Sequence, residues 1–166
     1  MTDTPLTRRD FFQAALRTAG AAGLVTLVFP QLAPAAHALS PTTLITVYKD
    51  PSCGCCVKWV SHLAANGFAP VVHDRTDMDA LKDSLGVPAA LRSCHTAVVG
   101  KYLIEGHVPA ADIKQLRAAA PGDVRGLAAP GMPVNSPGME MPGRRDRFDV
   151  IAFGANGSTR VFASHA

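Results

Sequence analysis

The sequence predicts an α/β sandwich, in which helices cover a β-sheet, and three observations lead to this prediction. Apolar, β-branched stretches of strand length alternate with stretches of helical periodicity between residues 44 and 119. Glycine, proline or asparagine stands at most boundaries between these stretches, where such residues commonly end a helix or a strand. A cluster of cysteines, at residues 53–56, lies at the first change from strand to helix. Together these features are typical of one α/β domain.

The first predicted strand covers residues 44–48, which are mostly apolar and β-branched, as expected of a buried strand. Val57, Val60 and Leu63 then recur at helical spacing, which predicts a helix with these residues facing inward. This helix is expected to end at Gly67, because glycine readily adopts the left-handed conformation that closes a helix.

The remaining elements follow in an order that indicates the fold. A short strand is predicted at residues 70–73, followed by a short amphipathic helix at residues 78–85 with Asp77 as its cap. An antiparallel hairpin at residues 96–105 and a third helix at residues 110–119 come next. The order β-α-β-α-β-β-α is that of a thioredoxin-like domain, in which a strand-to-helix turn carries a cysteine motif.

The first 38 residues predict an export signal that is not part of the fold. Arg8 and Arg9 precede two aromatic residues, and an apolar stretch follows at residues 14–29. Ala-His-Ala at residues 36–38 forms a small-x-small cleavage site, so the pattern is typical of a cleaved twin-arginine signal. An uncleaved membrane anchor is the alternative, but the apolar stretch is short for a span. The mature chain, residues 39–166, is therefore expected in the periplasm, without membrane contact.

The mature chain divides into three segments of one domain. Residues 39–120 are the thioredoxin-like, metal-binding part. Residues 121–147 are rich in glycine and proline, carry most of the methionines and lack periodicity, which predicts a methionine-containing loop. Residues 148–166 contain two apolar stretches joined by a loop with Asn156-Gly157, which predicts a C-terminal β-hairpin that completes the domain.

The charge of the chain excludes one class of partner. The formal net charge is only +3, and no patch of lysine and arginine is interleaved with aromatic residues. The one basic cluster, at residues 144–147, is better explained as a solvated loop. Nucleic acid is therefore not an expected partner.

Four cysteines carry the chemistry of this sequence. Cys53, Cys55 and Cys56 lie within four residues, at the start of a predicted helix. The free N–H groups and the dipole of a helix N-terminus stabilise a thiolate, which is the form that binds metal or attacks a disulfide. In the predicted topology the segment leading into the third strand packs beside this turn. We therefore expect Cys94 and His95 to face the first three cysteines.

Three interpretations of this cluster remain open. Two disulfides would pair all four cysteines in an oxidising compartment, but the crowded spacing makes complete pairing unattractive. A thiol–disulfide oxidoreductase would use Cys53 and Cys56, which form a C-x-x-C motif, and would leave Cys55 and Cys94 without a role. Metal binding uses all four and is the favoured interpretation.

Ligand softness predicts which metal is bound. Thiolates, imidazoles and thioethers suit Cu(I), with silver as its analogue and zinc as the competitor. Methionines in a polar loop are good soft ligands or a lid for such a site, although they could equally pack the loop onto the domain. The predicted metal-site residues are Cys53, Cys55, Cys56, Cys94, His95, His107, Met132, Met139 and Met141.

Several motifs resemble those of the CopG-type copper-resistance family, whose members are thioredoxin-like periplasmic metal-binding proteins long catalogued only as a domain of unknown function. The similar stretches are residues 48–56 with Trp59 and residues 62–63, then residues 86–88, 93–97, 105–109, 130–133 and 136–140. The resemblance thus spans nearly all of the mature chain.

This resemblance implies a copper-binding protein. It implies a polynuclear Cu(I)–thiolate site on Cys53, Cys55, Cys56 and Cys94, and a role in copper tolerance through redox interconversion of Cu(I) and Cu(II). A binding protein is favoured over a copper oxidoreductase. Copper ions are the expected partner, and other periplasmic copper-handling proteins are the expected sources or recipients.

Overall fold

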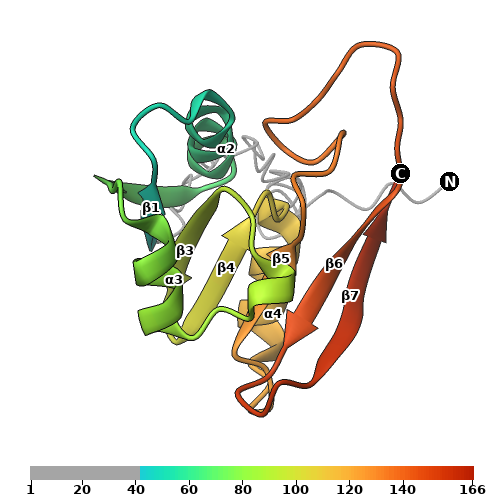
Figure 1. Cartoon of the computed structure of the whole chain (residues 1–166). Coiled ribbons are helices and arrows are strands. Elements are labelled where there is room, and N and C mark those ends of the chain that lie inside the picture. The colour runs from blue at the N-terminus through green and yellow to red at the C-terminus, as the bar shows by residue number, and fades with distance from the viewer. Residues whose placement is uncertain (1–41) are drawn as a thin grey trace, which may run out of the picture. The chain divides into compact units, whose positions relative to one another are not determined.

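The structure, a computed structural model, describes residues 42–166. The predicted export signal at residues 1–38 lies outside the described residues. Seven strands form one sheet with the order β2-β1-β3-β4-β5-β6-β7 (Figure 1). The strands are β1 (Thr43–Lys49), β2 (Phe68–Asp74), β3 (His95–Val99), β4 (Tyr102–Gly106), β5 (Gly126–Ala129), β6 (Phe148–Phe153) and β7 (Thr159–His165). The helices are α2 (Gly54–Ala65), α3 (Met78–Leu85) and α4 (Ala110–Ala119), with a 3-10 turn, η1 (Ala89–Leu91).

The α/β class predicted from the sequence is confirmed. Helix α2 connects the parallel strands β1 and β2, whereas β3 runs antiparallel to both β1 and β4. The order β-α-β-α-β-β-α from β1 to α4 is the expected one. Within residues 42–166, no helix is long and apolar enough to cross a membrane.

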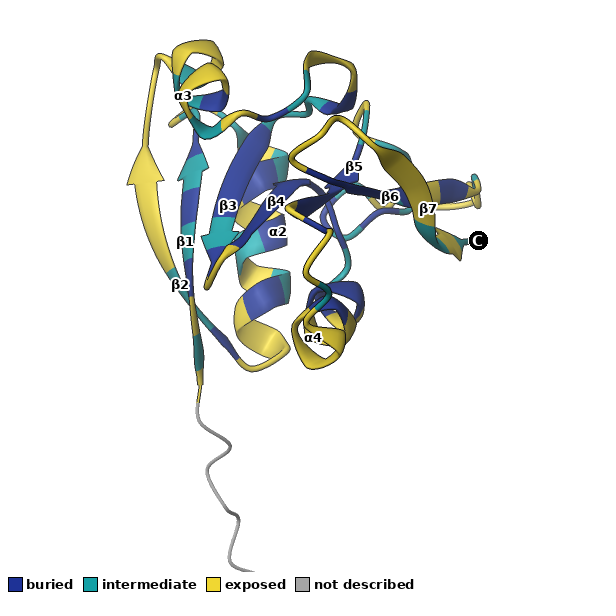
Figure 2. Cartoon of the chain, turned by 90° about the horizontal axis from the view of Figure 1, so that it is seen from below, coloured by how far each residue is buried: buried dark blue, intermediate teal, exposed yellow. Residues whose placement is uncertain are grey.

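Helices cover both faces of the sheet (Figure 2). Side chains of successive strand residues point to opposite faces, so each strand contributes to two layers. Helices α2 and α4 pack on one face through the larger core cluster, which includes Trp59, Leu63, Ile113 and Leu116. The turn η1 and the end of α3 pack on the other face through a smaller cluster, which includes Val87, Leu91, Leu103 and Phe153.

The inward face of α2 differs from the predicted one. Its buried residues are Cys56, Trp59 and Leu63, whereas the side chain of Val57 is 51% exposed. The prediction placed Val57 and Val60 inward, one position after the residues that are buried, and was correct at Leu63. The burial of Cys56 shows the reason, because this sulfur takes an inward position that an apolar side chain would otherwise fill.

One strand lies inside the segment predicted to be a loop. Strand β5 runs parallel to β4 and antiparallel to β6, so it joins the C-terminal hairpin of β6 and β7 to the rest of the sheet. Its four residues, Gly-Leu-Ala-Ala, are too few and too small to give a periodic signal. Gly126 is required there, because a Cβ atom would lie 2.3 Å from the carbonyl oxygen of Leu103.

Candidate metal centre

The cysteine turn joins the end of β1 to the start of α2. The backbone N–H of Cys53 donates to the carbonyl of Asp50 (3.1 Å), and the Asp50 carboxylate accepts the N–H of Ser52 (2.8 Å). Cys53 is the N-cap of α2, so Cys55 and Cys56 lie in the first helical turn. The local hydrogen bonds therefore place three sulfurs at the positive end of the helix dipole, as the sequence predicted.

Cys94 joins this cluster from the segment before β3. The Sγ atoms of the four cysteines all lie within 4.8 Å of one another. Cys53 and Cys56 form a disulfide, and Cys55 and Cys94 are free. A disulfide sulfur carries no thiolate charge, so the predicted four-thiolate set requires reduction of this bond.

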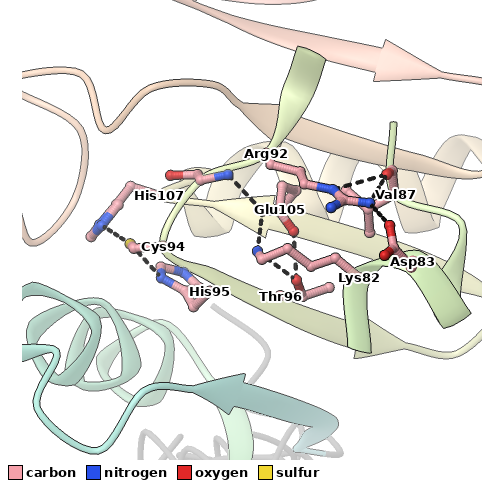
Figure 3. Close-up of polar contacts among 10 residues, drawn as sticks. Lys82, Asp83, Val87, Arg92, Cys94, His95, Thr96, Glu105 and His107 are labelled. Carbon is pink, nitrogen blue, oxygen red and sulfur yellow. Dashed lines mark hydrogen bonds and ion pairs between the residues drawn. The ribbon is translucent and has the colours of Figure 1, made fainter. Parts of the chain in front are cut away.

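A second group of ligand atoms shares Cys94. Its Sγ lies 3.2 Å from Nδ1 of His95 and 3.1 Å from Nε2 of His107 (Figure 3). The Nδ1 of His107 donates to the carbonyl of Pro137 (2.8 Å), which leaves a lone pair on Nε2 directed at the thiol. A histidine held in this way by its second nitrogen is the usual arrangement of a metal ligand. The structure thus brings His95 and His107 to the cysteines.

Burial controls the protonation of this second group. Burial lowers the pKa of His95 well below its ordinary value, and the nearby His107 and Lys82 act in the same direction. Burial also lowers the pKa of His107, against the opposing effect of its bond to Pro137. Both imidazoles are therefore neutral at neutral pH. Burial, with Cys55 nearby, raises the pKa of the Cys94 thiol to about 12, so this thiol stays protonated until a metal displaces its proton.

The copper-free protein is expected to lose stability as the pH falls from 7 to 5. The pKa values of His95 and His107 are lower in the folded state than the ordinary 6.5, so the unfolded chain binds more protons below that pH. One fully suppressed histidine costs about 2 kcal/mol at pH 5 relative to pH 7. Urea unfolding at several pH values measures the effect.

The pH window limits this loss to histidines, which include His62 because burial lowers its pKa as well, and one variant isolates the share of His95. The lowered pKa values of the carboxyl groups start from 3.8 or 4.5, so these groups titrate below the window. The His95→Gln variant should lose less stability between pH 7 and 5 than the parent protein. A free energy of unfolding that stays constant over this range would contradict the prediction.

The predicted methionine ligands lie at different depths in the loop between β5 and β6. The side chains of Met132 and Met141 are 44% and 51% exposed, whereas Met139 is half-buried. The backbone N–H of Met139 donates to the carbonyl of Ser136 (2.8 Å), which shapes the loop next to Gly138. A ligand role for the three thioethers stays a prediction.

The same loop packs onto the cysteine turn through a glycine whose role was not predicted. At Gly138 a Cβ atom would lie 2.9 Å from the backbone nitrogen of Trp59 and 3.0 Å from the carbonyl oxygen of Cys55. Only the methionines of this loop were predicted to serve the site, but Gly138 makes the contact. This close approach presents the Pro137 carbonyl to His107.

A buried ion pair beside the centre was also missed. Lys82 of α3 contacts Glu105 of β4, and both side chains are buried. A signal for this pair was present in the sequence, because a glutamate stood at the end of an otherwise apolar predicted strand.

This chain is similar to one family model and to solved structures. A family model described as "Protein of unknown function, DUF411" matches residues 91–139. Two solved structures, "Copper resistance protein copG- Form 1" and "Copper resistance protein copG- Form 2", are 48% and 47% identical to this chain. Each covers 75% of this chain and 98% of its own, with a TM-score of 0.71. No curated protein matches significantly.

Proposed function

We propose a copper-binding function for this chain, which belongs to the family of the copper resistance protein CopG. The observation that carries the proposal is the convergence of four cysteine sulfurs within 4.8 Å, with Cys94 shared by a second group that contains His95 and His107. So dense a set of soft ligands fits copper better than a hard cation. The copper-related role follows from family and site together.

Cu(I) is the oxidation state that the reduced cysteine cluster favours. A dithiol reductant would transfer two electrons and two protons to the Cys53–Cys56 disulfide, which leaves two thiols on the protein and a disulfide on the reductant. Copper then displaces the thiol protons, including that of Cys94. Four thiolates in so small a volume favour bridging of several Cu(I) ions over coordination of a single ion.

The two histidines extend the proposal to handling of both copper oxidation states. Neutral imidazole suits Cu(II) as well as Cu(I), whereas thiolate suits Cu(I). Cys94 belongs to both the thiolate group and the imidazole group. The loop methionines Met132, Met139 and Met141 would supply further soft ligands or a cover. Silver and zinc are the competing ions. The proposed role in copper tolerance includes export to the periplasm. There the protein would exchange copper with other copper-handling proteins.

Metal content tests this function. The reduced mature protein is expected to bind more than one Cu(I) per chain, with thiols that become reactive only after a strong Cu(I) chelator is added. The oxidised protein, which retains the Cys53–Cys56 disulfide, serves as the matched control and should bind less. One zinc per chain and no copper would contradict the choice of ion, and no bound metal would contradict the function.

The disulfide supports a second candidate, a thiol–disulfide oxidoreductase. Cys53 is half-buried and Cys56 fully buried, as expected of an attacking thiol and its resolving partner. Replacing Cys55 by serine separates the two functions. If copper binding is the function, Cys55→Ser lowers the number of coppers bound per chain. If disulfide exchange is the function, the variant keeps the parent's rate of insulin reduction, which Cys53→Ser abolishes.

A further inference from the structure

A buried polar network lies directly behind the segment that carries Cys94 (Figure 3). Its centre is the ion pair between Lys82 and Glu105, whose side chains are 3% and 0% exposed. Lys82 is the one fully buried residue of α3, whose partly buried Leu85 also packs on the smaller core cluster. A charge therefore takes the most buried position of this helix, where an apolar side chain would be usual. The pair therefore calls for an explanation other than packing.

The carboxylate of Glu105 accepts hydrogen bonds from three separate elements. Its Oε1 accepts Lys82 Nζ from α3 and the backbone N–H of Ser93 (2.7 Å), and its Oε2 accepts the hydroxyl of Thr96 on β3 (2.6 Å). Lys82 Nζ also donates to the Thr96 oxygen (3.0 Å). The bond to Ser93 matters most for the site, because Ser93 immediately precedes Cys94.

The last two residues of β4 and the residue after it contact the segment around Cys94. Glu105 binds the N–H of Ser93, and Gly106 lies so close that a Cβ on it would be 2.6 Å from the Ser93 Cβ. His107 then places Nε2 3.1 Å from the Cys94 sulfur. The position of the thiol thus depends on the Ser93 backbone, and Glu105 supplies the acceptor for its N–H.

Stability alone does not account for a buried ion pair at this place. Replacing such a pair with apolar side chains of similar volume is often neutral or stabilising, because the two charges no longer have to be desolvated. An apolar pair would, however, leave the N–H of Ser93 without its acceptor. The network therefore supplies a hydrogen-bond acceptor for Ser93, which an apolar contact cannot.

We propose that Glu105 is a positioning residue for Cys94, which fixes the backbone of Ser93 so that the thiol meets both the cysteine cluster and the two histidines. Lys82 and Thr96 act through Glu105, because they hold its carboxylate in the orientation that accepts the Ser93 N–H. The consequence for copper rests on the function proposed above, whereas the placement of the thiol can be measured without copper.

Two double variants isolate the acceptor from the charges. Lys82→Met with Glu105→Gln removes both charges and keeps a carbonyl oxygen for the Ser93 N–H. Lys82→Met with Glu105→Leu removes both charges and the acceptor as well. The two proteins differ only in the side chain at position 105, and neither contains a buried unpaired charge. Asp83→Asn is the control, because it breaks the ion pair between Asp83 of α3 and Arg92, the residue before Ser93, but keeps the Glu105 acceptor of the Ser93 N–H.

The first measurement is the alkylation rate of Cys94 relative to Cys55 in the copper-free protein with its disulfide intact, read by mass spectrometry. The Leu-containing double variant should alkylate Cys94 about tenfold faster, as expected when a buried hydrogen bond is lost, with Cys55 unchanged. The Gln-containing variant and Asp83→Asn should retain the parent rates. Competition with a chromophoric Cu(I) chelator on the reduced proteins should show an affinity loss of about tenfold in the Leu-containing variant alone.

Several outcomes would overturn the inference. Equal Cys94 rates in the two double variants would show that the acceptor does not fix the thiol, and equal acceleration of Cys55 and Cys94 would indicate general loosening. If the Leu-containing variant does not fold, Thr96→Val removes the hydroxyl that donates to Glu105 Oε2 and accepts from Lys82 Nζ, and an unchanged Cys94 rate there would reject the role. If the parent protein binds no copper, the proposed function fails while the alkylation comparison still decides this inference.

Discussion

Replacing Cys94 with serine is expected to weaken Cu(I) binding more than replacement of Cys55. Cys94 is the one residue that belongs both to the group of four sulfurs and to the group with His95 and His107. Its loss removes a thiolate and also separates the imidazoles from the cysteine cluster. Removal of a metal ligand should cost at least as much as removal of a residue that merely supports one, so the loss of affinity should be at least about 100-fold.

The matched control is Cys55→Ser, since Cys55 belongs to the group of four sulfurs but not to the group with the histidines. Both variants keep the Cys53–Cys56 disulfide and replace a thiol by a hydroxyl of similar shape. Affinity is measured by chelator competition after reduction, together with the number of coppers bound. Equal losses in the two variants would show that the histidine group adds nothing to the site. A free energy of unfolding within about 1 kcal/mol of the parent would show that the copper-free fold is intact.

Much of this fold could be predicted because its signals are local. Strand β1 and helix α4 lie at the residues where the sequence predicted a strand and a helix, and Gly86 closes α3 in the left-handed conformation. Strand β5 could not be predicted, because it is held by pairing with both β4 and β6 rather than by its own four residues. Pairing of this kind depends on distant segments and leaves no periodic pattern.

The composition of the candidate site was likewise easier to predict than its hydrogen bonds. The topology alone was enough to place Cys94 beside the cysteine turn, because β3 lies next to β1 in the sheet. The sequence left the pairing of the cysteines open, and the structure joins Cys53 to Cys56. The bond from His107 to the Pro137 carbonyl depends on the exact path of a loop, which has no sequence pattern of its own.

Replacing Gly106 with alanine is expected to destabilise the copper-free protein by about 2–5 kcal/mol. The φ angle of Gly106 is +71°, a left-handed conformation that costs an alanine about 1–2 kcal/mol. The added Cβ would also lie 2.6 Å from the Ser93 Cβ and 2.7 Å from the Ala129 carbonyl oxygen. Relieving such contacts in a packed interior costs about 1–3 kcal/mol more.

Gly131→Ala separates the two contributions, because Gly131 has the same φ of +71° but no atom within 4 Å of an added Cβ. Urea unfolding of both variants should therefore give a loss of about 1–2 kcal/mol for Gly131→Ala and a larger one for Gly106→Ala. The second readout is the reactivity of the Cys94 thiol. Relief of the contact at Gly106 moves Ser93 away from β4, so Cys94 should leave His107 and become more reactive to alkylating agents. Equal losses of stability in both variants and an unchanged Cys94 reactivity would show that the close packing of Gly106 against Ser93 does not set the place of the thiol.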